Sequence, residues 1–157
     1  MAEAHTVETQ GFLISTFYLG QALCGLDTLK VQEVVRLGRV TPVHDSPEYL
    51  VGIINLRGKI ITVIDLGLKL GLGPREACAD SLVYIIESWG EYIGLLIDGV
   101  ADVVAVEREG LAPPPENVNG VLAQFITGVW RTDLSLIAIL DVETVLEGDS
   151  AGSDREA

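Results

Sequence analysis

The sequence has few of the residues that build metal sites, disulfide frameworks and catalytic centres. Its 157 residues include only two cysteines and two histidines. Cys24 and Cys78 form no CxxC pair, so neither a disulfide framework nor a zinc site is expected, and both are interpreted as free thiols. Neither His5 nor His44 has an obvious nucleophile or ligand set beside it in the sequence. We therefore expect no metal and no cofactor.

Basic residues are also scarce. Ten lysines and arginines stand against 23 aspartates and glutamates, which gives a formal net charge of −13. Neutralisation of phosphate supplies most of the affinity of proteins for nucleic acids and anionic membranes. The charge balance therefore disfavours both as partners.

Long apolar runs are missing as well. No uninterrupted stretch approaches the ~18 residues of a membrane span, and residues 1–10 lack the basic start and apolar core of a signal peptide. These absences predict a cytoplasmic protein without membrane insertion. A hydrophobic content of 48% indicates a real core. We expect one folded domain over residues 12–147, with small, polar, disordered tails at 1–11 and 148–157.

The most informative segment runs from Gly52 to Leu66. Two runs rich in β-branched residues flank Arg57-Gly58, a composition that favours buried, pleated strands joined by a tight turn. Gly58 supplies the backbone freedom of the reversal, and Asn55 can hydrogen-bond locally as the chain enters the bend. The segment therefore predicts a β-hairpin with Arg57 at its tip.

The hairpin segment recurs later in the chain. Residues 128–142 align without gaps with 52–66 at an offset of 76, and 94–104 echo 25–35 at an offset of 69, with Asp102 in the slot of Glu33. The two matches indicate a duplicated unit of roughly 70 residues. We place the seam in the polar loop 75–80, which predicts approximate subdomains at 12–75 and 81–147.

Ten strands and little helix are expected over the folded region. Alternating or branched patterns mark the strands at 12–19, 22–26, 35–40, 52–56, 60–66, 81–87, 92–97, 100–106, 125–131 and 134–140. Short helical turns are expected at 29–34, 47–51, after Leu66 and at 141–146. This count favours two five-stranded barrels or a pair of small packed sheets.

Sequence signatures of catalysis are lacking. There is no P-loop, no GxGxxG after a strand and no GxSxG. Asp65 and Asp141 each end a strand at the same point of the duplicated unit, which is typical of turn or cap chemistry. We therefore predict a protein that is not an enzyme.

Several motifs together resemble the CheW-like adaptors of bacterial chemotaxis arrays. They are Val31-Gln-Glu-Val34, Thr41-x-x-His-x-x-Pro47, Gly52-Ile-Ile-Asn-Leu-Arg-Gly58, Ile60-Ile-Thr-Val-Ile-Asp-Leu66 and Gly94-Leu-Leu-Ile-Asp98. The resemblance implies a mainly β fold of two SH3-like five-stranded barrels with a groove between them and a few short helices. It also implies a non-catalytic adaptor that couples chemoreceptor cytoplasmic tips to the regulatory domain of the histidine kinase CheA, monomeric in isolation and multimeric in arrays.

The candidate binding residues combine the hairpin tip with branched residues of both repeats. An arginine fork can grip a partner or brace its own loop, and the resemblance favours a partner-binding role for Arg57. The valines occupy equivalent points of both repeats and belong either to the core or to a groove that accepts a helical receptor tip. The complete candidate set is Val31, Glu33, Val34, Asn55, Arg57, Gly58, Val100 and Val103.

Two departures from the family pattern and two alternatives stay open. Thr62 replaces a usual proline, and Asn117 stands where the family can place an apolar or aromatic residue. If that position contributes to a contact between adaptor and kinase in array rings, Asn117 is expected to weaken it. The sequence is also compatible with an adaptor of a non-flagellar chemosensory system, for twitching motility or gene regulation. A small β module with a ligand in the cleft between its halves is a further alternative.

Overall fold

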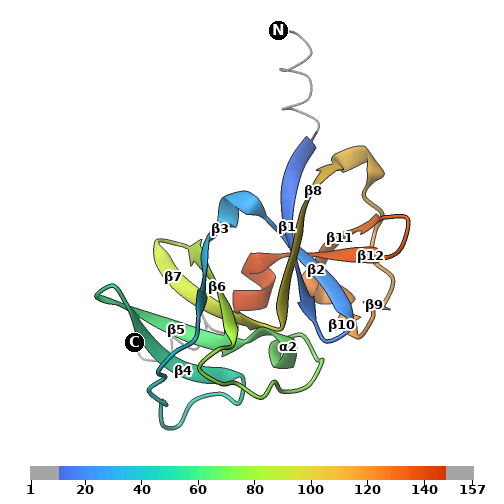
Figure 1. Ribbon diagram of the computed structural model, residues 1–157. Coiled ribbons are helices and arrows are strands. Elements are labelled where there is room, and N and C mark those ends of the chain that lie inside the picture. The colour runs from blue at the N-terminus through green and yellow to red at the C-terminus, as the bar shows by residue number, and fades with distance from the viewer. Residues whose placement is uncertain (1–10, 148–157) are drawn as a thin grey trace, which may run out of the picture.

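Two five-stranded sheets side by side form the framework of the protein (Figure 1). The computed structural model describes residues 11–147, so residues 1–10 of the expected tail 1–11, and all of the expected tail 148–157, lie outside the described residues. Gly11, expected in the first tail, begins the first strand. The expectation of a mainly β protein with two sheets and short helices is confirmed.

The elements follow one another in a regular order. The strands are β1 (Gly11–Leu19), β2 (Ala22–Asp27), β3 (Val31–Arg36), β4 (Leu50–Leu56), β5 (Lys59–Asp65), β6 (Leu82–Ser88), β7 (Glu91–Ile97), β8 (Gly99–Glu107), β9 (Asn117–Val118), β10 (Val121–Leu122), β11 (Ile126–Arg131) and β12 (Leu136–Leu140). The short helices are η1 (Thr28–Lys30), α2 (Leu66–Lys69), η2 (Arg108–Gly110) and η3 (Ala123–Phe125), and residues 142–147 are also helical.

The two sheets have matching strand orders. Sheet A has the order β11-β12-β2-β1-β8, and sheet B has the order β4-β5-β7-β6-β3. Each sheet contains one parallel pair, β12 with β2 in sheet A and β5 with β7 in sheet B. Every strand of one sheet therefore has a counterpart in the other, as a duplicated sequence requires.

Irregularities of pairing are duplicated too. The register of the β4–β5 pair shifts between Leu50 and Gly52, and that of the β11–β12 pair shifts between Ile126 and Gly128, which is the same place at the 76-residue offset. Isolated bridges join Thr41 to Ile53 and Ala112 to Val129, again at equivalent points on the outer edges of β4 and β11. The repeat inferred from the sequence is therefore also present in the backbone.

The sheets do not follow the expected subdomains 12–75 and 81–147. Sheet B takes β3, β4 and β5 from the first repeat and β6 and β7 from the second, whereas sheet A takes β1 and β2 from the first and the remaining three strands from the second. A parallel pair cannot be closed by a tight turn, and the long connection between β5 and its parallel neighbour β7 runs through the polar loop and β6. The loop 75–80 separates the two repeats in sequence, but each sheet is built from strands of both repeats.

Two equivalent glycines show why the repeat keeps a residue without a side chain. A Cβ at Gly25 would lie 2.3 Å from Cγ2 of Ile14 on β1, and a Cβ at Gly94 would lie 2.7 Å from Cγ1 of Val83 on β6. At both glycines, therefore, a branched side chain of the neighbouring antiparallel strand occupies the space that a Cβ would need. The close packing of this strand pair explains the match at the 69-residue offset.

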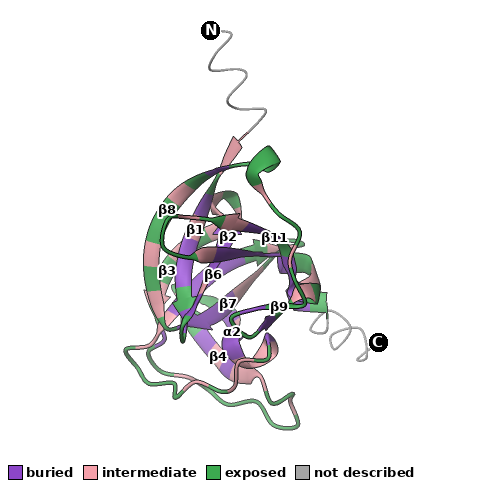
Figure 2. Ribbon diagram, turned by 90° about the vertical axis from the view of Figure 1, so that its right-hand side faces the viewer, coloured by how far each residue is buried: buried purple, intermediate pink, exposed green. Residues whose placement is uncertain are grey.

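The core has three parts. The largest cluster joins the two sheets and includes Phe17 and Leu26 from sheet A together with Ile64 and Leu95 from sheet B. Smaller clusters fill the interior of sheet B and of sheet A separately. Figure 2 shows the buried residues on the central strands and exposed residues on the outer strands and loops.

The segment expected as a helical turn at 29–34 is largely a strand. Helix η1 spans only Thr28–Lys30, where the Asp27 side chain accepts a hydrogen bond of 3.0 Å from the Leu29 N–H. From Val31 onward the chain pairs antiparallel with β6. The branched residues Val31, Val34 and Val35 favour the strand, and pairing with β6 satisfies their backbone groups.

The interpretation of the two repeated aspartates as caps is confirmed. Asp65 precedes α2 and its side chain accepts a hydrogen bond of 3.1 Å from the Leu68 N–H. Asp141 accepts bonds from the backbone N–H of Thr144 at 3.4 Å and from its hydroxyl at 3.0 Å. Both carboxylates therefore satisfy the first turn of a helix.

Candidate partner-binding surface

The β4–β5 hairpin has the turn that its sequence predicts. Arg57 has φ of 51° and Gly58 has φ of 87°, so both central residues are left-handed, as in the two-residue turns that match the twist of a hairpin. The Asn55 side chain accepts a hydrogen bond of 3.0 Å from the Gly58 N–H and closes the bend. The three predicted residues are therefore adjacent at one end of sheet B.

Arg57 reaches back from the hairpin tip to β3. Its guanidinium forms a hydrogen-bonded ion pair with the carboxylate of Glu33, and the two side chains are 66% and 36% exposed. An exposed pair of this kind contributes about 0–1 kcal/mol to folding, so it orients the tip more than it stabilises the fold. Beneath it is a hollow of about 160 Å³, lined in part by Ile61, Ile85 and Tyr92.

A bulge in each of the edge strands β3 and β8 brings the candidate valines onto common faces. Residues three apart point to opposite sides of a regular strand. In the β3–β6 pair, however, Val31 is opposite Ile86 and Val34 is opposite Tyr84, so three steps along β3 match only two steps along β6. Strand β3 therefore carries one extra residue between its two valines. Strand β8 likewise carries one extra residue between Val100 and Val103, which are paired with Phe17 and Ser15 of β1. Each bulge therefore places its two valines on one side of the strand.

Three of these four valines are exposed. The exposed fractions are 39% for Val34, 49% for Val100 and 58% for Val103. Val31 is half-buried and packs against the cluster that joins the sheets. Strands β3 and β8 lie along the same side of the molecule, at the front in Figure 1 and along the left edge in Figure 2. We call Val31, Val34, Val100 and Val103 the valine surface.

A second apolar surface lies on the hairpin itself and was not predicted from the sequence. Ile60 was expected in a largely buried strand but is 66% exposed, because it precedes the point where β5 enters the core. It borders a hollow of about 460 Å³ that is also lined by Ile53, Leu56, Arg36 and Arg39. We call the three apolar hairpin residues Ile53, Leu56 and Ile60 the hairpin surface.

The described residues offer little support for catalysis or metal binding. Between residues 11 and 147, no group of three or more histidine, cysteine or acidic side chains is placed to hold a metal ion. Burial raises the pKa of Cys24 to about 12, and burial also raises the pKa of Tyr84. Both groups therefore stay protonated at neutral pH. In this part of the chain no helix has the length and apolarity needed to cross a membrane.

Comparison with known proteins identifies the family. The family model of the CheW-like domain matches residues 14–150. The chain belongs to the CheW-like domain family. The chemotaxis protein CheW of Treponema pallidum is 35% identical over 87% of this chain and 82% of its own length, and that of Klebsiella aerogenes is 30% identical over 90% and 86%.

A solved structure of a family member has the same fold. The crystal structure of the scaffolding protein TtCheW from Thermoanaerobacter tengcongensis superposes with a TM-score of 0.77 at 38% identity, and the match covers 86% of this chain and 87% of that one. The resemblance proposed from the sequence motifs is therefore confirmed, and the chain is a chemotaxis scaffold of the CheW family.

Proposed function

We propose that the protein couples chemoreceptor cytoplasmic tips to a CheA-type histidine kinase, and that it does so in the cytoplasm without chemistry of its own. Its work in this proposal is to hold the receptor and the kinase regulatory domain together. The observation that carries the proposal is the exposure of Val34, Val100 and Val103 on the edge strands of two different sheets.

The valine surface suits a helical partner. Branched aliphatic residues are usually buried, and an exposed set of them bordered by polar groups is typical of a protein-binding site. A receptor tip is a helical hairpin, and an amphipathic helix that lays its apolar face against such residues is a recurrent mode of recognition. We assign the receptor to this surface, with affinity in arrays increased by the linkage of many copies.

The Arg57–Glu33 pair gives the receptor site a polar margin. Glu33 lies on β3 between the two valines of that strand, and its exposed partner Arg57 can exchange this carboxylate for an acidic group of a bound protein. The pair therefore holds the arginine fork in place before binding, which lowers the entropy cost of ordering it in the complex.

The hairpin surface is a second binding site in this proposal. Ile60 is more exposed than any residue of the valine surface and lies on β5, which β6 and β7 separate from β3 in the order of sheet B. Separate apolar surfaces are what an adaptor with two simultaneous partners requires. We assign the kinase regulatory domain to the hairpin surface.

The decisive experiment measures both bindings and their consequence. The full-length protein is titrated with a receptor cytoplasmic fragment and with the CheA regulatory domain, and receptor-dependent kinase activation is then measured with Arg57→Glu. Reversal of a charge at an interface is expected to reduce activation about tenfold or more, with the circular dichroism spectrum unchanged. The matched control is Arg131→Glu, an equal charge change at an exposed position on β11, which should leave activation unaltered.

Two results would contradict the proposal. A folded protein that binds neither partner would remove the coupling function, and a binding response to a metabolite library in thermal-shift measurements would favour a small-ligand module instead. Unchanged activation with Arg57→Glu, in a protein that does bind both partners, would remove Arg57 from the site and leave the valine surface to be tested separately.

A further inference from the structure

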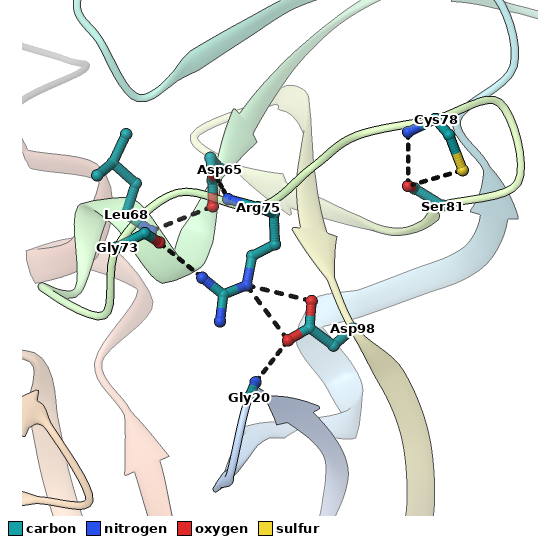
Figure 3. A network of polar contacts seen from close by, with 8 residues as sticks. All are labelled: Gly20, Asp65, Leu68, Gly73, Arg75, Cys78, Ser81 and Asp98. Carbon is teal, nitrogen blue, oxygen red and sulfur yellow. Dashed lines mark hydrogen bonds and ion pairs between the residues drawn. The ribbon is translucent and has the colours of Figure 1, made fainter.

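A nearly buried arginine from the loop between the repeats joins the two sheets. The side chain of Arg75 is 14% exposed, although the sequence places it in a polar loop. Its Nε donates to both oxygens of the Asp98 carboxylate at 3.1 and 3.3 Å, and its Nη1 donates to the Gly73 carbonyl at 2.6 Å (Figure 3). The Arg75 backbone N–H donates to Asp65 at 2.8 Å, which ties the loop to the end of β5.

Asp98 is the residue at which the chain passes from sheet B to sheet A. Strand β7 of sheet B ends at Ile97, and β8 of sheet A begins at Gly99. The Asp98 carboxylate also accepts a hydrogen bond from the Gly20 N–H in the β1–β2 turn, and its backbone N–H donates to the Tyr18 carbonyl at 3.0 Å. Hydrogen bonds to Gly20 and Tyr18 therefore hold Asp98 to sheet A. Its ion pair with Arg75 holds it to the loop that follows α2 in sheet B.

The space for the guanidinium depends on a glycine. A Cβ at Gly67 in α2 would lie 2.5 Å from Nη1 and 2.6 Å from Cζ of Arg75. Gly67 is helical and needs no left-handed backbone, so alanine there fits the helix and conflicts only with the arginine. The helix, the guanidinium and Asp98 thus form one packed contact between the sheets.

We propose that Arg75 and Asp98 are positioning residues that set the distance between the two halves of the valine surface. Val100 follows Asp98 by two residues on β8, whereas Val31 and Val34 lie on β3 of the other sheet. A loss of the guanidinium leaves the bonds of Asp98 to Gly20 and Tyr18, so the pairing of β8 with β1 persists. What is lost is the polar contact that fixes the start of β8 relative to α2 and the end of β5 in sheet B, and with it the fixed spacing that a helical receptor tip needs. The inference therefore rests on the proposed receptor site.

The test uses three lesions of the same contact. Arg75→Gln removes the charge, Asp98→Asn removes its partner, and Gly67→Ala displaces the guanidinium without changing any charged residue. Each should weaken binding of a receptor cytoplasmic fragment about fivefold while binding of the CheA regulatory domain changes less than twofold. Gly67→Ala should add nothing in the Arg75→Gln background, because the two substitutions remove one contact.

The matched control removes an arginine that lies outside the contact of Arg75 with Asp98 and Gly67, which we call the clasp. Arg108, beyond the end of β8, packs over the Phe12 ring at 4.9 Å from its centroid. Arg108→Ala should leave the ratio of the two affinities unchanged. Equal loss of receptor and kinase binding in Arg75→Gln, or a loss of receptor binding in Arg108→Ala as large as in Arg75→Gln, would reduce the clasp to a general stabilising contact and overturn the proposal.

A distance measurement tests the clasp without any partner. Spin labels on Gln32→Cys in β3 and Ala105→Cys in β8, in a Cys78→Ser background, report the separation of the two edge strands by pulsed electron resonance. Both labelled positions are exposed. Gly67→Ala should broaden the distance distribution. An unchanged distribution would refute the clasp even if the receptor binds, whereas a broadened one in a protein that ignores the receptor fragment would keep the clasp and refute the proposed function.

Discussion

Replacement of Val103 by threonine separates binding from folding at the valine surface. Threonine keeps the branched shape and the strand preference of valine and exchanges one methyl group for a hydroxyl. Because Val103 is 58% exposed on β8, the hydroxyl can reach water in the free protein. The free energy of unfolding should therefore change by no more than about 0.5 kcal/mol.

Receptor binding should respond much more strongly to the same change. If the helical tip covers Val103, the hydroxyl is taken from water without a partner, which costs about 1–2 kcal/mol. At 1.4 kcal/mol for each factor of ten, the affinity for a receptor cytoplasmic fragment should fall about five- to thirtyfold. Isothermal titration with the fragment measures this loss, and denaturant unfolding measures stability on the same sample.

The same strand supplies the matched control. Val106, three residues further along β8, is 1% exposed and belongs to the core of sheet A. Val106→Thr buries its hydroxyl in the folded protein itself and should destabilise it by about 1–3 kcal/mol. The reasoning is refuted if Val103→Thr costs as much stability as Val106→Thr, or if it leaves the receptor affinity within twofold of the original.

Three further predictions concern other parts of the molecule. Ile60→Thr should leave the free energy of unfolding nearly unchanged, because the side chain is 66% exposed. In a titration it should weaken binding of the kinase regulatory domain by about 1 kcal/mol. An unaltered affinity would remove the hairpin surface from the proposal. Gly94→Ala should lower the free energy of unfolding, measured in denaturant, by about 1–3 kcal/mol, because the added Cβ would lie 2.7 Å from Cγ1 of Val83. An unchanged free energy of unfolding would mean that the packing of β6 against β7 is not as close as described. Iodoacetamide at pH 8 should label Cys78 in the native protein and Cys24 only after unfolding, since burial raises the pKa of Cys24 from its ordinary value of 9.0 to about 12. Stability from this thiol is full below pH 9 and declines as the pH rises toward 12, and rapid native labelling of both thiols, counted by mass spectrometry, would contradict the buried position.

Local features of the hairpin and the caps were predictable because nearby residues cause them. Asn55, Arg57 and Gly58 define a turn whose left-handed backbone and side-chain bond depend on four consecutive positions. Asp65 and Asp141 cap the turns that follow them for the same reason. The duplicated unit was also visible, since the glycines and branched residues recur at constant offsets.

The position of individual apolar side chains was less predictable. Ile60 has the same branched side chain as Ile61, yet it is 66% exposed and Ile61 is 1% exposed. The valines three apart were ambiguous between core and interface, because a bulge that no local pattern announces decides their common face. Arg75 was read as part of a polar loop, although its partner Asp98 lies 23 residues away.

The local features of this protein could be inferred from its amino-acid sequence: strands, turns, caps, a negative net charge, a duplicated unit and a family. These features follow from neighbouring residues, whose preferences act within a few positions of the chain. The folded structure was needed to show that the first two strands of each repeat join the sheet of the other repeat, and which valines remain exposed. Both outcomes depend on pairing between distant strands, where the fit of parallel neighbours and packed glycines, and not any local preference, selects the arrangement.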